Sequence, residues 1–267
     1  MIGFRIIESG IATSVQDQGR PGYAHLGLGR SGAVDLVAAG VLNRALGNSE
    51  STPVIETAGG LVVECISRSI IATSNWTSPR LVAEGERVRV NPEAGRQWAY
   101  LAVSGGFSGT PILGSLSSDS MADLVVVDVS AGAELQVGTA SIGSPTDLIA
   151  PRPAQMEITL MPGPHLDRLG PSALSTLTST NWVVENNSRV GIRLTGGLVE
   201  MPAESANGQS EPMIVGAVQI PPNGQPIVLG RDHPVTGGYP VAAVVDDSGI
   251  STVLGARVGS TLRFRMK

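Results

Sequence analysis

The sequence predicts a mainly β protein made of two similar β-barrel halves, each with about one helix. Short runs rich in Val and Ile recur along the 267 residues and are separated by Gly- and Pro-containing turns, which is the pattern of strands. Helical spacing of apolar residues occurs once in each half. Because each half has a loop, one helix and several strands, a duplicated small barrel is the natural architecture.

The first half is expected to begin with strands at 4–8 and 11–15, followed by a loop over 16–32. This loop is not low in complexity and leads into a helix, so we expect it to be ordered and functional. Apolar residues at helical spacing and the stop signal of Gly47 predict a helix over 35–46. Further strands are expected at 54–56, 61–66, 69–73, 86–90, 98–103, 124–129 and 134–137.

A turn-rich and Pro-rich segment at 143–153 separates the halves, so we place the domains at 1–146 and 147–267. In the second half a short helix is expected near Pro171, with Leu174 and Leu177 on one face. Strands are expected at 156–161, 182–185, 191–194, 213–220, 227–229, 239–245 and 251–254. The segments 83–90, 130–137 and 257–264 share a Gly-turn-strand form, which indicates a closing strand for each barrel-like module.

Composition excludes several classes of partner. Only 15% of residues are charged, against about 25% in an average soluble protein, which suggests that a partner covers part of the surface. The net charge of −5 and the lack of a basic run argue against nucleic acid and anionic membranes. Cys65, the single cysteine, lies in an apolar run and is expected to be a buried small hydrophobe. No secretory signal or long apolar stretch is visible, so we expect a cytoplasmic protein.

The segment 216–240 has more polar side chains than its two strands and turns require. The polar residues that stand where strands end, beside the glycines of a Gly-Gly-Tyr-Pro run, are Gln219, Gln225, Asp232, His233, Thr236 and Tyr239. Each of them singly is explained by the preference of such residues for turns. Their density together, and the close approach of backbone to ligand that glycine permits, favour a binding site.

Common catalytic and metal motifs are missing from the sequence. The three histidines are far apart along the chain, no metal-binding spacing occurs, and we expect no metal site. The run at 27–32 departs from the dinucleotide fingerprint at its last position and follows no strand. Arginines and carboxylates in loops are more informative, since an Arg can clamp a carboxylate while acidic groups orient an amide. The alternatives are that Asp35 is a helix N-cap and that Arg189 and Arg193 lie on a solvated strand face.

Several motifs together resemble a known family. They are Thr13–Tyr23, Arg30–Asp35, Asn43–Asn48, Tyr100–Gly106, Leu113–Ser115, Ser188–Arg193 and the segment 216–240. In this order they resemble the allophanate hydrolase subunit 2 family, also called the biotin-dependent carboxyltransferase-like family. It includes the C-type subunit of 5-oxoprolinase, an antagonist of a sporulation-kinase inhibitor, and the carboxyltransferase region of urea carboxylase.

The resemblance implies two cyclophilin-like β-barrel domains. It also implies a partner, subunit 1, which is the B-type subunit of 5-oxoprolinase or a kinase-inhibitor-like protein, and a lactam-utilisation protein is a candidate third subunit. ATP would be used by the complex, and no cofactor is assigned to this chain.

Site residues follow from the positions that match the family's motifs. The resemblance implies catalytic roles for Glu211, Asp232, Thr236 and Tyr239, and substrate binding by Asp17, Arg20, Ser31, Asp35, Arg189, Arg193, Gln219, Gln225, Gly237 and Gly238. We expect Arg189 to bind a substrate carboxylate, because its planar fork matches one. Glu211 and Asp232 would orient or deprotonate an amide, and residues 236–238 would offer donors to its carbonyl oxygen. We expect these groups, from both halves, to face one cleft.

The sequence departs from the family at three positions. Leu116 stands where the family often has Arg, Ser188 where it has Asp, and Val241 where it has Lys. Loss of two cations argues against a urea carboxylase-type transfer, which needs positive charge on anionic intermediates. The leading interpretation is therefore the large subunit of an ATP-dependent amide hydrolase acting on a small lactam or urea-derived substrate, most simply 5-oxoproline. The alternatives are a regulatory protein that antagonises a kinase inhibitor and a carboxyltransferase component.

Overall fold

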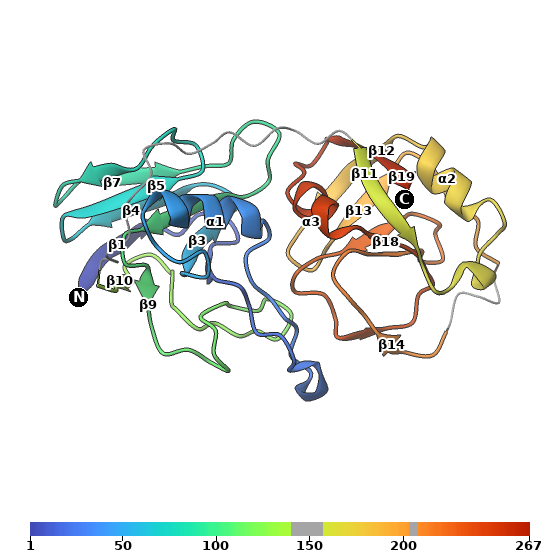
Figure 1. Ribbon diagram of the computed structural model, residues 1–267, viewed down its shortest axis with the longest axis horizontal. Coiled ribbons are helices and arrows are strands. Elements are labelled where there is room, and N and C mark those ends of the chain that lie inside the picture. Colours follow the sequence, from blue (N-terminus) through green and yellow to red (C-terminus); the bar gives the residue numbers. More distant parts are fainter. Residues whose placement is uncertain (140–156, 203–207) are drawn as a thin grey trace. The chain divides into compact units, whose positions relative to one another are not determined.

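The computed structural model describes residues 1–139, 157–202 and 208–267 and divides the chain into two compact units (Figure 1). Unit 1 comprises Met1–Gly22 and Arg30–Arg152, and unit 2 comprises Tyr23–Gly29 and Pro153–Lys267. The expected domain boundary at 146/147 lies outside the described residues. A short segment of the first half, Tyr23–Gly29, therefore groups with the second unit.

Unit 1 consists of two antiparallel five-stranded sheets around one core. The first has the order β7-β4-β1-β10-β9, formed by Arg87–Val90, Leu61–Cys65, Ile2–Glu8, Glu134–Val137 and Phe107–Ser108. The second has the order β2-β3-β8-β5-β6, formed by Ser14–Gln16, Val54–Thr57, Ala99–Val103, Ser69–Thr73 and Arg80–Val82. Phe4 and Ile6 of the first sheet and Leu101 of the second are all 0% exposed, so the sheets share this core.

The single α-helix among the described residues of unit 1, α1, spans Leu36–Ala45 and confirms the helix predicted from apolar spacing. Asp35 begins it, because its side chain accepts a hydrogen bond from the amide of Ala38 and so satisfies one of the unpaired N–H groups of the first turn. Gly47, with φ of 72°, follows the last turn.

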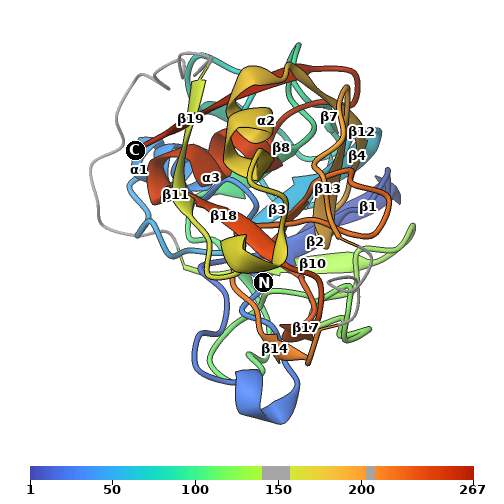
Figure 2. The same ribbon diagram turned by 90° about the vertical axis from the view of Figure 1, so that its right-hand side faces the viewer.

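Unit 2 is a closed seven-stranded barrel with the order β11-β18-β15-β16-β13-β12-β19. These strands are Glu157–Pro162, Val241–Val245, Ala217–Gln219, Ile227–Leu229, Gly191–Thr195, Trp182–Asn187 and Thr261–Met266. Outside the barrel, β14 (Glu211–Pro212) and β17 (Thr236–Gly237) form a two-stranded sheet, which Figure 2 shows side by side. Helix α2 (Ala173–Ser179) packs against β19, and α3 (Asp247–Leu254) packs against β11.

The predicted fold class is confirmed: the chain is mainly β and contains a closed barrel. The strand predicted at 251–254 is wrong, because these residues lie in α3. Asp246 caps that helix by accepting from the amide of Ser248, and Ile250, Val253 and Leu254 recur at helical spacing. Unit 2 therefore has two α-helices among its described residues instead of about one.

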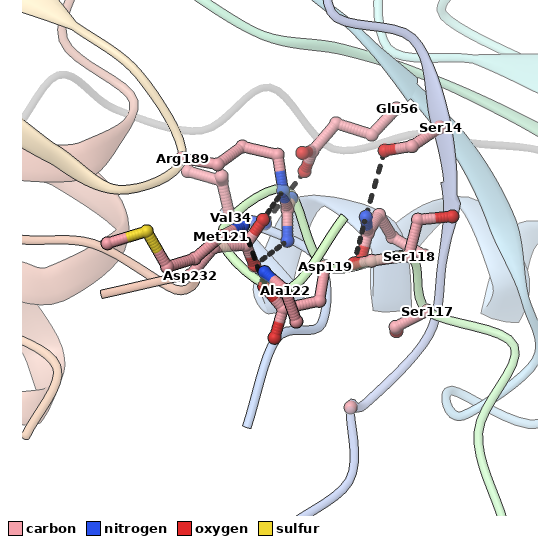
Figure 3. A network of polar contacts seen from close by, with 12 residues as sticks. Ser14, Val34, Glu56, Ser117, Ser118, Asp119, Met121, Ala122, Arg189 and Asp232 are labelled. Atoms are coloured by element: carbon pink, nitrogen blue, oxygen red, sulfur yellow. Dashed lines mark hydrogen bonds and ion pairs between the residues drawn. The ribbon is translucent and has the colours of Figure 1, made fainter. Parts of the chain in front are cut away.

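The strand predicted at 124–129 is also wrong. Leu124 makes an isolated bridge to Asp119, and no ladder continues from it. The carboxylate of Asp119 accepts hydrogen bonds from the amides of Met121 and Ala122, at 2.9 and 3.1 Å, which holds a local turn in place of a strand (Figure 3). Val126 and Val127 still pack against the core of unit 1, which explains the apolar pattern.

A buried polar network ties α1 to the second sheet of unit 1. The hydroxyl of Tyr100 donates to Glu56 at 2.8 Å and accepts from the amide of Asp35 at 2.8 Å, while the amide of Val34 donates to Glu56 at 2.7 Å (Figure 3 shows the last contact). Burial, together with the negative charges of Glu56 and Asp35, holds the pKa of Tyr100 well above its usual value. Tyr100 therefore remains a neutral hydrogen-bond donor.

Cys65 is fully buried in the core of unit 1, as the sequence predicts. Burial raises the pKa of its thiol, so the reactive thiolate is scarce. We expect Cys65→Ala to lower the free energy of unfolding by about 1–2 kcal/mol, because it removes a small buried group. The activity of the assembled protein should be unchanged. Rapid labelling of the native chain by a thiol reagent, with loss of activity at native stability, would count against a purely structural role.

Candidate functional site

A carboxylate–imidazole pair lies outside the barrel of unit 2. Glu211 belongs to β14, and its Oε2 lies 3.1 Å from Nε2 of His165, which follows shortly after β11. The side chain of Glu211 is 49% exposed, whereas that of His165 is only 12% exposed. A solvent-accessible carboxylate is thus within hydrogen-bond distance of a largely buried imidazole.

The hydrogen bonds of His165 determine which ring nitrogen carries its proton. The backbone amide of Val241, the first residue of β18, lies 3.0 Å from Nδ1. Since an amide N–H can only donate, Nδ1 accepts and the proton of the neutral ring lies on Nε2. Nε2–H therefore donates to Glu211. His165 is itself fixed because its amide donates to the carbonyl of Val241 at 3.3 Å.

The glycine-rich segment after β17 packs closely on this pair. Glu211 is the strand partner of Gly237, and a Cβ on Gly237 would lie 2.9 Å from Nε2 of Gln219. A Cβ on Gly238 would lie 2.9 Å from the backbone carbonyl oxygen of Gly208, so Gly238 has no room for a side chain, whereas a Cβ on Gly237 would require the side chain of Gln219 to move. Arg168 donates to the carbonyl of Gly238 at 3.2 Å and holds the segment from the other side.

Five residues predicted as site residues are thus brought together in unit 2: Glu211, Gln219, Gly237, Gly238 and, as the strand neighbour of Gly237, Thr236. Thr236 and Tyr239 are exposed, with Tyr239 at 40%, while Gln219 is 6% exposed and donates to the sulfur of Met213. An exposed carboxylate held by an imidazole can accept a proton from an amide and orient it. Glu211, His165, Gln219 and residues 236–239 are together called the Glu211 site.

Arg189 and Asp232 form a separate buried ion pair. Nε and Nη2 of Arg189 donate to the two oxygens of Asp232, each at 2.8 Å, and the side chains are 6% and 0% exposed (Figure 3). The amide of Asp232 also donates to the carbonyl of Arg189. The structure therefore directs the fork of Arg189 at Asp232, and its expected contact with a substrate carboxylate stays a prediction.

The other two predicted residues of unit 2 lie apart from the Glu211 site contacts. Arg193 is exposed on β13, where its strand partners are Asn186 and Ile227. Gln225 precedes β16 in a turn in which its amide and side chain both contact Asn223. Roles in substrate binding for both residues stay predictions.

The four predicted residues of unit 1 lie at the two ends of the loop that connects β2 to α1: Asp17 and Arg20 at its start, and Ser31 and Asp35 at its end. Asp17 accepts from Gly19, Leu116 and the hydroxyls of Ser115 and Ser117, so it holds the loop to the 115–117 segment. Arg20 is 1% exposed and donates to the carbonyls of Ser117 and Ile112.

Ser31 and Asp35 lie at the end of this loop, before α1. Ser31 is 1% exposed and has a positive φ of 53°, an uncommon conformation for a residue other than glycine. Asp35 caps α1, in agreement with the alternative interpretation given from the sequence. The expectation that residues of both halves face one cleft stays a prediction.

Sequence reasoning does not identify His165 and Arg168. Both lie shortly after Pro164, at least 43 residues before Glu211, and nothing in their spacing indicates the contact of His165 with Glu211 or that of Arg168 with Gly238. The available signal is their position just after an expected strand, where site residues often lie. Among the described residues no group of three or more His, Cys, Asp or Glu side chains could hold a metal ion. The described helices include none that is both long and apolar enough to cross a membrane.

A family model described as "Carboxyltransferase domain, subdomain A and B" matches residues 26–266. The chain belongs to this carboxyltransferase-domain family. The resemblance stated from the sequence is thereby confirmed over most of the chain.

Two curated relatives of the family carry the same name. The chain is 29% identical to the C-type subunit of 5-oxoprolinase from Escherichia coli, over 97% of this chain and 90% of the relative. It is 30% identical to the C-type subunit of 5-oxoprolinase from Haemophilus influenzae, over 94% of this chain and 87% of the relative.

Solved structures share the fold of this chain. The crystal structure of TTHA0988 superposes with a TM-score of 0.88 at 30% identity, and the match covers 99% of this chain and 56% of that one. The urea carboxylase of Kluyveromyces lactis superposes with a TM-score of 0.86 at 23% identity, over 98% of this chain and 27% of that one, which shows the fold alone.

Within this carboxyltransferase-domain chain, two positions at which the family often has cations are apolar and buried. Leu116 is 7% exposed and belongs to the core of unit 1, and Val241 is 4% exposed and belongs to a small core of unit 2. Neither position can supply a positive charge to a reacting group.

Proposed function

We propose that the chain is the C-type subunit of an ATP-dependent 5-oxoprolinase, in which 5-oxoproline is hydrolysed to glutamate. The observation that carries this proposal is the near full-length similarity to two proteins that bear this subunit's name. The reaction opens a lactam, so it requires a group that handles the amide N–H and donors that stabilise charge on the carbonyl oxygen.

The Glu211 site supplies groups of this kind. The carboxylate of Glu211 would accept or orient the lactam proton, since it is exposed to a ligand and held by His165. The hydroxyl of Thr236 and the phenol of Tyr239, both exposed, would donate to the carbonyl oxygen. We assign ATP to the complex and not to a site in this chain.

A carboxyltransferase role is the second candidate, because the chain also shares its fold with urea carboxylase. The apolar residues at Leu116 and Val241 count against it, since carboxyl transfer develops negative charge that needs cations nearby. A regulatory role without catalysis is the third candidate, and the exposed carboxylate of Glu211, held by the largely buried His165, favours the enzyme subunit over it.

A partner subunit is part of the proposal. We expect this chain and a B-type subunit to form a hetero-oligomer, because only 15% of its residues are charged. Co-expression followed by size-exclusion chromatography at micromolar concentration tests the assembly. Separate elution of the two chains would remove the partner from the proposal.

The substrate is tested with the same preparation. In the presence of all subunits, ATP hydrolysis should be stimulated by 5-oxoproline and should yield glutamate. Stimulation by urea together with bicarbonate and biotinylated carrier, but not by 5-oxoproline, would instead support the carboxyltransferase. Assembly without any turnover of either substrate would support the regulator.

A further inference from the structure

We propose that His165 is a positioning residue whose tautomer is fixed by the backbone of β18, so that its Nε2–H holds the carboxylate of Glu211. The kinetic part of this inference rests on the proposed function, whereas the hydrogen-bonding part does not. His165 lies outside the motifs that relate this chain to its family.

The first step is the geometry of the imidazole. The ring has one contact to a group that can only donate, the amide of Val241 at 3.0 Å from Nδ1, and one to a carboxylate, Glu211 at 3.1 Å from Nε2. Only the neutral tautomer with the proton on Nε2 satisfies both contacts. A proton on Nδ1 would point at the amide hydrogen of Val241, and the two hydrogens would repel each other.

The second step is the rigidity of the support. The amide and carbonyl of Val241 both bond to His165, and Val241 is 4% exposed within the closed barrel. β14, in contrast, is two residues long and pairs only with β17 among the described strands. The imidazole of His165 is therefore held in place by the barrel. Its hydrogen bond in turn restrains the carboxylate of Glu211, which lies on the short strand β14 outside the barrel.

The third step is the effect of the hydrogen bond from His165 on the reactivity of the Glu211 carboxylate. An exposed Glu side chain samples several rotamers, and holding one oxygen in place reduces the entropy lost on reaching the reactive geometry. One oxygen of Glu211 is engaged by His165, and the other is the one that would meet the lactam N–H. His165 acts through Glu211 and does not touch the substrate.

The chain contains an internal reference for the tautomer. Nδ1 of His233 lies 2.8 Å from the carbonyl oxygen of Pro234, so in His233 Nδ1 must carry a proton. Neutral His165 and neutral His233 are therefore expected in opposite tautomers. The chain has only three histidines, so His25→Gln and His233→Gln assign the signals.

The first test is a long-range ¹H–¹⁵N correlation spectrum of the full chain labelled at its histidine ring nitrogens, recorded at a pH where the rings are neutral. We expect an unprotonated Nδ1 and a protonated Nε2 for His165, and a protonated Nδ1 for His233. Glu211→Ala should shift the Nε2–H signal of His165, and the control Glu185→Ala, on exposed β12, should not. A protonated Nδ1 in His165, or no response to Glu211→Ala, would overturn the proposal.

The second test compares two variants in the assembled complex. The Oδ1 of His165→Asn can replace Nδ1 and keep the Val241 bond but cannot reach Glu211, whereas the amide of His165→Gln can reach Glu211. We expect His165→Asn to lower kcat about tenfold or more, because misplacing a catalytic group by about 1 Å can cost about 100-fold, with KM little changed. His165→Gln should recover part of the loss. Equal activity of both variants at wild-type level would refute the positioning role, whereas an inactive wild-type complex would refute only the proposed function.

Discussion

Replacing Asp232 with Asn is expected to cause a large loss of stability in unit 2. The substitution keeps the shape of the side chain but takes the bidentate carboxylate away from the guanidinium of Arg189, and the two side chains are only 6% and 0% exposed. Breaking a buried pair from one side costs about 3–5 kcal/mol, because two charge-assisted hydrogen bonds in a desolvated setting are weakened together. For a unit of this size the melting temperature should fall by about 10 °C or more.

Thermal unfolding followed by circular dichroism measures this effect. Glu157→Gln is the matched control in the same unit, because it removes one partner of the exposed Arg265–Glu157 pair, whose side chains are 55% and 59% exposed. That change should cost less than about 1 kcal/mol. The double variant Arg189→Met/Asp232→Leu should recover much of the lost stability, since both charges are removed together. A melting temperature of Asp232→Asn equal to that of the control would show that the pair is solvated and contributes little.

Replacing Glu211 with Gln is expected to have the largest effect on activity. Gln keeps the size of the side chain, an oxygen that can accept from His165, and the backbone pairing of Glu211 with Gly237. It removes only the charge and the ability to take up a proton, so kcat/KM for 5-oxoproline should fall by about 10²–10⁴-fold, the usual contribution of a general base.

Steady-state kinetics of the assembled complex measure this loss, with Glu185→Gln as the control on the exposed face of β12. The melting temperature and elution volume of Glu211→Gln should match those of the wild type, so that the loss is not one of folding or assembly. Wild-type kcat/KM in Glu211→Gln would remove this carboxylate from the reaction and favour the regulatory candidate.

Much of the fold follows from local sequence signals, and the errors of prediction have local causes. The helix at Leu36–Ala45 is predictable because four apolar residues recur at helical spacing and Gly47 follows. The eight-residue α3 contains only about two turns, so its helical spacing rests on three apolar residues, and its last four residues taken alone resemble a short strand. The apolar run from Leu124 resembles a strand too, although the backbone of Leu124 pairs only with that of Asp119 and the amide of Val126 donates to the hydroxyl of Ser118.

The candidate site is only partly predictable, for a different reason. Gln219 and the glycines at 237–238 stand in one polar-rich stretch of sequence, and Glu211 lies shortly before it. The contact of His165 with Glu211 depends on barrel closure, which places the end of β11 beside the start of β18. Likewise the pairing of Arg189 with Asp232 joins residues 43 apart, and no spacing rule connects them.

The central claim, that this chain is a required subunit in the hydrolysis of 5-oxoproline, is tested most directly by omission and add-back. The partner subunits are assayed for ATP-dependent glutamate formation from 5-oxoproline without this chain, and the purified chain is then titrated in. We predict no glutamate above background in its absence, and a rise that saturates at a fixed ratio of this chain to its partners. Full glutamate formation by the partner subunits alone would contradict the account.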